Sequence, residues 1–160
     1  MQEDINIQEL QQAVEFNLTR DGFLVPVVFI CSNEGAKILD ATEYMQSDQT
    51  KDMMVAEVSA FARQQNAYKI LIVSEGWMYD LPKGMRQEEL NELIQTTQYR
   101  EKLSRSEVYQ IIEITEQSIT SIFRKYYKED AVVVLGELMP TEDIELVRFK
   151  PLQDCLQRVN

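Results

Sequence analysis

Tyr68–Ser74, with the sequence YKILIVS, is the stretch on which the predicted fold rests. Its centre is an unbroken run of four apolar residues, three of them β-branched. Such a run is typical of a strand that is buried on both faces of a sheet. Glu75-Gly76-Trp77 follows directly. The sequence therefore predicts a buried strand whose C-terminal end carries an acidic and an aromatic side chain.

An antiparallel hairpin is predicted before this strand. Phe23–Cys31 is almost entirely apolar, which favours a strand buried on both faces, and Pro26 indicates that this strand is irregular or lies at a sheet edge. Asn33–Gly35 has the composition of a tight turn. The more polar segment Ala36–Tyr44 is then expected to be the returning strand of the hairpin.

The second half of the chain contains an ambiguous segment, residues 107–127. Its apolar residues fit one face of a helix, whereas its β-branched and aromatic content favours two strands with a turn near Glu116–Ser118. We prefer the two strands. A further strand is predicted at Ala131–Leu135, ended by Gly136, and a last short strand at residues 144–149.

Helices are predicted where apolar residues recur at helical spacing. One covers Asp4–Arg20, with Asp4 or Asn6 as its cap, and another covers residues 51–66. After a polar loop in the 80s, apolar residues near position 90 suggest a short third helix. These elements predict one α+β domain over residues 1–160. It would be a mixed, largely antiparallel sheet of about five or six strands with two or three helices packed on it.

The composition excludes several kinds of active site. The 160 residues contain no histidine and two cysteines, so a Ser-His-Asp triad, a His-containing zinc site and an all-thiolate cluster cannot form within one chain. The five glycines form neither a G-x-G-x-x-G motif nor a Walker A loop. We therefore expect no metal and no cofactor, and we assign no catalytic residue.

Charge and hydropathy restrict the compartment and the partners. The net charge of −11 disfavours nucleic acid and anionic membranes, because both bind to clustered Lys and Arg. The acidic N-terminus is unlike a secretory signal, and the longest apolar run, Phe23–Cys31, is too short to cross a bilayer. Cys31 and Cys155 are expected to be free thiols. We expect a cytoplasmic protein whose partner is another protein or a small ligand, with its oligomeric state left open.

Ser74-Glu75-Gly76-Trp77 is the segment that most resembles a binding site, because the C-terminal ends of strands often carry ligand-facing groups. Gly76 is expected to turn the chain sharply there. A structural role is the alternative that we favour. In that role Trp77 closes the edge of the core, and Glu75 pairs with an arginine on a neighbouring strand.

Two weaker patterns lie nearby. Glu75 and Glu107 form the carboxylate pair that a hydrolase would need, although the 27 acidic residues make chance pairs common. Arg86, Arg100 and Arg105 are basic residues that would suit an anion, although scattered surface charge explains them equally well.

Two segments resemble an uncharacterised family of bacterial α/β proteins. They are Arg20–Ile30, which carries a DGxLxP strand, and Ala67–Trp77, a strand with a Ser-Glu-x-Trp-like end. Arg105–Val108 is similar to the charged segment that leads into the family's next strand. The resemblance implies strands rather than a helix at residues 107–127. It implies no activity.

These observations favour a non-enzymatic binding or regulatory domain that recognises its partner through the region Trp77–Met85. The candidate binding residues are Ser74, Glu75, Trp77, Arg105 and Glu107. One alternative function is a small enzyme that uses the Glu75 carboxylate with Arg or Tyr partners. Another is an acidic inhibitor that imitates a nucleic acid.

Overall fold

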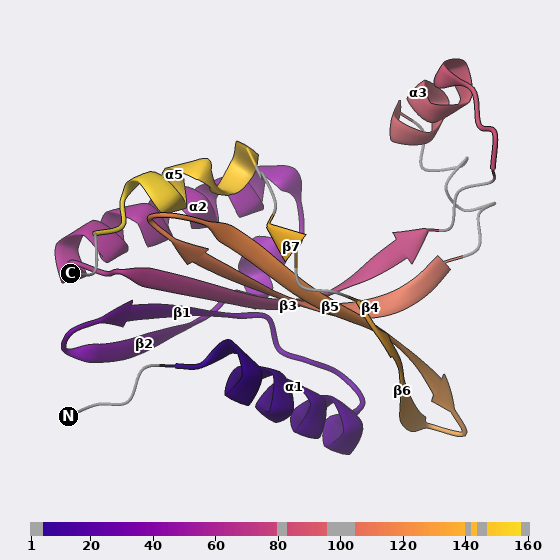
Figure 1. Cartoon of the computed structure of the whole chain (residues 1–160), viewed down its shortest axis with the longest axis horizontal. Helices are drawn as coiled ribbons and strands as arrows, with labels where there is room; N and C mark the ends of the chain where they lie inside the picture. The colour runs from indigo at the N-terminus through magenta and orange to yellow at the C-terminus, as the bar shows by residue number, and fades with distance from the viewer. Residues whose placement is uncertain (1–4, 80–82, 96–104, 140–141, 144–146, 158–160) are drawn as a thin grey trace.

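The computed structural model describes residues 5–79, 83–95, 105–139, 142–143 and 147–157 (Figure 1). Within them the strands form one sheet in the order β2-β1-β3-β4-β5-β6, and a short β7 also pairs with β5. The bounds are Val27–Ser32 (β1), Gly35–Asp40 (β2), Lys69–Tyr79 (β3), Arg105–Thr115 (β4), Ile119–Glu129 (β5), Val132–Leu138 (β6) and Glu142–Asp143 (β7). The α+β prediction is confirmed. The strand pairs are all antiparallel rather than mixed.

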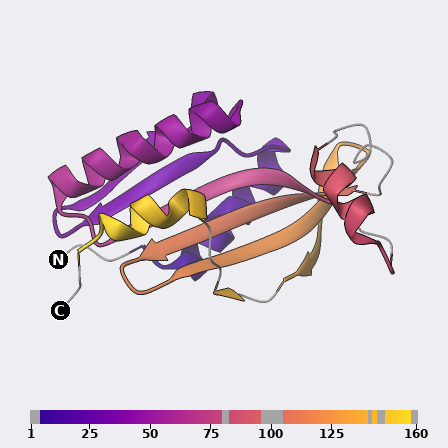
Figure 2. The same ribbon diagram turned by 90° about the horizontal axis from the view of Figure 1, so that it is seen from above.

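Helices lie against both faces of this sheet. Helix α1 (Ile7–Asp21) packs on one face, and α2 (Asp48–Gln65) with α5 (Lys150–Asp154) packs on the other, as Figure 1 shows. Helices α2 and α5 lie side by side in Figure 2. Helix α3 (Gln87–Gln95) lies at the far end of the sheet, beyond β3.

The sequence at the ends of α1 accounts for its bounds. Asn6 is the N-cap, and its Oδ1 accepts a hydrogen bond from the backbone N–H of Gln8 at 2.7 Å. Gly22 ends the helix in the left-handed conformation, with φ of 81°, which glycine adopts without strain. The predicted first helix is therefore confirmed, with Asn6 rather than Asp4 as its cap.

Strand alternation divides the core into two layers. Ile70 and Ile72 of β3 face α2, whereas Leu71 and Val73 face α1. Val28, Val58 and Ile72 share the α2 layer, with Phe61 partly buried at its margin. Both cysteines are buried, one in each layer, and no disulfide joins them.

The ambiguous segment 107–127 forms two strands, β4 and β5, as preferred from its composition. The turn between them lies at the predicted place, where Ser118 N–H donates to Thr115 Oγ1 at 3.2 Å. A third helix is also present near residue 90.

Two details of the predicted hairpin are wrong: the edge position inferred from Pro26 for its first strand, and the end of its second strand. Strand β1 is internal to the sheet, and Pro26, which has no N–H to donate, lies just before it. Strand β2 ends at Asp40 instead of reaching Tyr44. The Asp40 carboxylate accepts from Thr42 N–H at 2.9 Å, and the chain turns there into the 3-10 helix η1 (Thr42–Met45).

Two predicted boundaries near the C-terminus also differ. Strand β6 does not end at Gly136 but continues through it. A Cβ on Gly136 would lie 3.1 Å from the Lys125 carbonyl oxygen, so the absence of a side chain allows β6 to approach β5 closely there. Val147–Phe149 forms a 3-10 helix, η2, that leads directly into α5, which contains Pro151 in its first turn. Residues 144–146 of the predicted last strand lie outside the described residues.

Candidate functional site

Strand β3 carries three of the predicted site residues along a regular strand. Its register pairs Ser74 with Gln110 and Trp77 with Glu107 on β4, and pairing continues to Tyr79. The sharp turn predicted at Gly76 is therefore wrong, since the strand alternates normally through it. Alternation places Glu75 and Trp77 on the α1 face and Ser74 on the α2 face.

The Glu75 carboxylate is held by two donors. Its Oε1 accepts from the Tyr126 hydroxyl at 2.9 Å and from the Leu24 backbone N–H at 3.1 Å. The predicted pairing of Glu75 with an arginine is wrong, because Arg124, the arginine on this face of β5, is engaged by α1 instead. The pKa of Tyr126 is raised, chiefly because the ring is buried and next because its hydroxyl donates a hydrogen bond to Glu75.

A second acid–tyrosine contact lies on the same face and attaches α1 to the sheet. Glu15 Oε1 accepts from the Tyr109 hydroxyl at 2.6 Å and from Arg124 Nη1 at 2.8 Å. Burial opposes ionisation of Glu15, but the hydrogen bonds from Tyr109 and Arg124 outweigh it, so the pKa of Glu15 lies below its ordinary value. Sequence reasoning missed this cluster because Glu15 lies far from both partners along the chain.

Trp77 is not enclosed, contrary to the structural role favoured from the sequence. Its side chain is 49% exposed, and the Arg105 guanidinium lies over its ring at 4.1 Å from the centroid. Strands β3 and β4 extend past α1 and α2 here, toward α3, so neither α1 nor α2 covers this end of the sheet (Figure 1). A cation over an indole face is an attractive arrangement in which Arg105 shields part of the ring.

A groove of about 580 Å³ lies beside Trp77, and we call it the Trp77 groove. Its lining includes the aromatic residues Trp77, Tyr126 and Tyr127 and the basic residues Arg105, Lys125 and Lys128. Glu107 and Glu137 add two acids. Aromatic and cationic side chains from β3, β4 and β5 thus converge on one surface.

The structure brings together three of the five predicted site residues, Trp77, Arg105 and Glu107, in the Trp77 groove. Glu75 adjoins the groove through its bond to Tyr126, and Ser74 lies on the opposite face of the sheet. Arg86 does not line the groove. It pairs with Glu89 on α3 at 3.2 Å. Arg100 lies outside the described residues.

Tyr126, Tyr127, Lys125 and Lys128 are the lining residues that sequence reasoning missed. They form one continuous segment, KYYK, near the end of β5. Tyrosines interleaved with lysines on a predicted strand were the available signal, but nothing in the sequence indicated that this segment lies beside Trp77.

Neither a metal-binding cluster nor a membrane-spanning helix is found in the described part of the chain. No group of three or more acidic or cysteine side chains there is arranged to hold a metal ion. No helix among the same residues is long and apolar enough to cross a membrane.

The chain matches no protein-family model, and no curated protein or solved structure is significantly similar to it. The function must therefore be argued from the geometry of the groove.

Proposed function

We propose that this chain is a protein-binding module that recognises an acidic segment of its partner through the Trp77 groove. The observation that carries the proposal is the half-exposed Trp77 with Arg105 over its ring, next to the exposed Tyr127. Trp, Tyr and Arg are the residues that most often dominate binding energy at protein interfaces. An exposed cluster of all three is uncommon on a surface with no partner.

The charge of the groove supports an acidic partner. Three basic residues and two acidic residues line it, so the groove is locally basic although the chain carries a net charge of −11. A basic partner would be drawn to the rest of this acidic surface instead. An acidic segment would be attracted to the Trp77 groove and repelled by the rest of the surface. These charges would set where the partner binds and how it is oriented.

The surface beside the groove supports a protein rather than a small molecule. Tyr127, Val132 and Leu138 on β5 and β6 are large apolar side chains with at least two fifths of their area exposed. Tyr127 lines the groove itself, and Val132 and Leu138 lie on β6, the strand paired with β5. A neighbouring apolar area of this kind suits a macromolecular contact with an apolar centre and a charged rim.

The hydrogen bonding of Glu75 weakens the alternative of a carboxylate enzyme. Its Oε1 accepts from two donors, and one of them, Tyr126, has a raised pKa and stays protonated at neutral pH. Glu75 therefore links β3 to β5 and to the segment before β1. These two bonds commit Oε1 to the fold rather than to a substrate.

Site-specific photocrosslinking in cells tests the proposal. Tyr127 is replaced by the photoreactive p-benzoylphenylalanine, and the same replacement at Phe16 on α1 is the matched control, since both side chains are at least half exposed. The groove position is expected to give one dominant crosslinked protein. Trp77→Ala and Arg105→Ala, made in the Tyr127-labelled chain, are each expected to reduce that product by at least about tenfold.

The crosslinked protein also tests the predicted charge. An acidic segment is expected at the crosslinked peptide when it is mapped by mass spectrometry. When the irradiation is repeated in a cell lysate, the yield of this product is expected to fall as ionic strength rises. Equal products from positions 127 and 16, or a product that Trp77→Ala leaves unchanged, would contradict the proposal.

A further inference from the structure

A second cavity, of about 530 Å³, lies on the other face of the sheet, beside the first turns of α2. We propose that it binds a small aliphatic monocarboxylate, with the carboxylate near Lys51 and Arg148 and the aliphatic chain against the apolar lining. This site is independent of the Trp77 groove. Ser74 lines the cavity and Trp77 lines the groove, and their side chains project to opposite faces of β3.

The floor of the cavity exists because the sheet loses its large side chains there. On the α2 face of β3, the buried Ile70 and Ile72 are followed by Ser74 and Gly76. A Cβ built on Gly76 would meet only Val108 Cγ2, at 3.9 Å, so there is space above the strand. The isoleucine layer that supports α2 therefore stops, and a hollow takes its place.

Polar groups on this floor are fixed in position. Gln110 Nε2 donates to Ser121 Oγ at 3.0 Å, and Ser121 is 1% exposed, so the amide is anchored from inside the sheet. The second hydrogen of Nε2 is not used by that bond. Ser74, which pairs with Gln110 across β3 and β4, adds a hydroxyl. The floor thus offers hydrogen-bond donors to an anionic oxygen.

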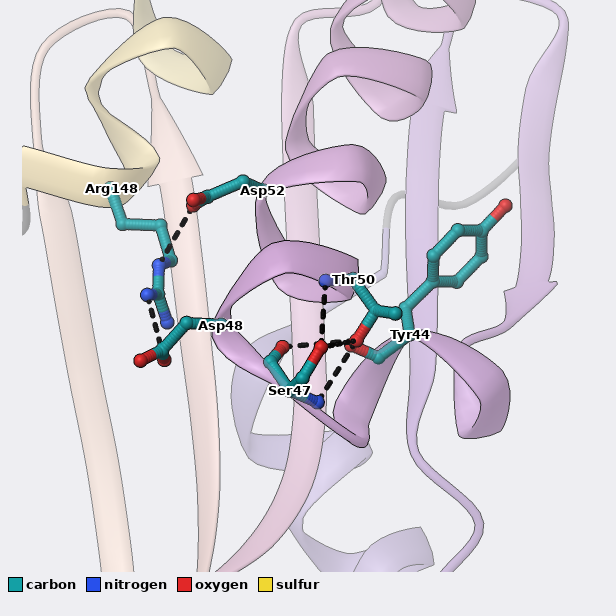
Figure 3. A network of polar contacts seen from close by, with 6 residues as sticks. All are labelled: Tyr44, Ser47, Asp48, Thr50, Asp52 and Arg148. Carbon is teal, nitrogen blue, oxygen red and sulfur yellow. Dashed lines mark hydrogen bonds and ion pairs between the residues drawn. The ribbon is translucent and has the colours of Figure 1, made fainter.

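The wall beside α2 is held by the hydrogen bonds that Figure 3 shows. Ser47 and Thr50 form a capping box, and Thr50 Oγ1 also donates to the Tyr44 carbonyl at 2.9 Å. These contacts tie η1, which contributes Met45 to the lining, to the first turn of α2, which contributes Lys51. The backbone positions of both lining residues are therefore held relative to each other.

Two cations line this cavity. Arg148 donates from Nη2 to Asp48 at 3.0 Å and from Nε to Asp52 at 3.2 Å, which fixes the guanidinium and leaves further N–H donors (Figure 3). Lys51 is partly buried and has no carboxylate partner among the described residues. A partly buried cation beside an apolar hollow favours an anion that brings its own apolar group.

The size and the remaining lining indicate the class of ligand. A volume of about 530 Å³ lies within the usual range for small-molecule sites. Apart from the cations and the polar floor, the lining is mainly apolar, with Leu24, Pro26, Met45, Met54, Ile72, Ile112 and Phe149. Glu75 also lines the cavity, but alternation along β3 directs its carboxylate to the opposite face, where it accepts from Tyr126. Two methionines suit a flexible aliphatic chain, because they adapt to irregular shapes. One negative charge matches Lys51, which has no carboxylate partner in the part of the chain that the structure describes.

Titration calorimetry with octanoate and octanol tests the proposal. The two probes share the aliphatic chain and differ in the carboxylate. Octanoate is expected to bind at least about tenfold more tightly than octanol. Lys51→Gln is expected to remove this preference, and Lys37→Gln on the exposed strand β2 is the matched control that retains it.

Ser74→Leu provides a second variant, which fills the floor without changing charge. It is expected to weaken both probes, and circular dichroism checks that the fold persists. Trp77→Ala is expected to leave octanoate binding unchanged, which separates this site from the proposed protein-binding groove. No octanoate binding at millimolar concentration, or the same affinity for octanoate in the Lys51→Gln chain, would overturn the proposal.

Discussion

Removal of the Tyr109 hydroxyl offers the sharpest test of how α1 is held on the sheet. Tyr109 is fully buried and donates to Glu15 at 2.6 Å, so Tyr109→Phe removes a donor to a partly buried carboxylate while keeping the ring. Hydrogen bonds to charged groups contribute about 1.5–3 kcal/mol. We expect the free energy of unfolding to fall by about 1.5–3 kcal/mol at pH 7, measured by urea denaturation.

The effect should depend on pH in a defined direction. The pKa of Glu15 is lower in the folded protein than its ordinary value, so the ionised carboxylate stabilises the fold above the ordinary carboxyl range. This contribution is lost as the pH falls through the folded pKa. Tyr109→Phe removes one cause of the lowered pKa, and the difference from the unmodified chain should shrink in acid.

Tyr44→Phe is the matched control, because Tyr44 also donates to a glutamate, Glu57, but at an exposed position. We expect it to change the free energy of unfolding by less than about 0.5 kcal/mol. The reasoning would be refuted if both variants lost equal stability. It would also be refuted if the loss in Tyr109→Phe were the same at pH 7 and in acid.

Three further substitutions test the geometry of the sheet. Trp77→Ala should lower the free energy of unfolding by about 1.5–2.5 kcal/mol, because half of the side chain is already in water, and iodide should quench the fluorescence of this single tryptophan. A loss of about 4 kcal/mol or more would mean that the ring is enclosed. Gly136→Ala should cost about 1–2 kcal/mol in thermal or urea unfolding, because its Cβ would lie 3.1 Å from the Lys125 carbonyl oxygen. Gly76→Ala, with 3.9 Å to its nearest neighbour, should be tolerated, and a larger loss at Gly76 than at Gly136 would contradict this reasoning.

Local signals made the helices and hairpins predictable. Signals that act over a few residues can be read from the sequence. They include Asn6 before an apolar stripe, Ser47 before α2, and Asn33–Gly35 between two strands. The two strands at β4 and β5 were identified because β-branched content outweighed a coincidental helical spacing.

The site was less predictable because its contacts join distant residues. Glu75 and Tyr126 are 51 positions apart, and Glu15 and Arg124 are 109 apart, so no local pattern could reveal either pair. The exposure of Trp77 also has a distant cause. It depends on β3 and β4 extending beyond the helices, and aromatic residues are more often placed in a core than left at a strand end.

The position of β3 has a consequence for how the protein unfolds. The strands on its two sides are built from hairpins, β1 with β2 and β4 with β5 and β6, which form between neighbours in the sequence. Strand β3 is the only described strand that bonds to both groups. Backbone hydrogen bonding between the two groups of described strands therefore passes through β3. Substitutions that weaken its backbone pairing should separate one transition into two, whereas equally destabilising changes in β2 or β6 should leave a single transition.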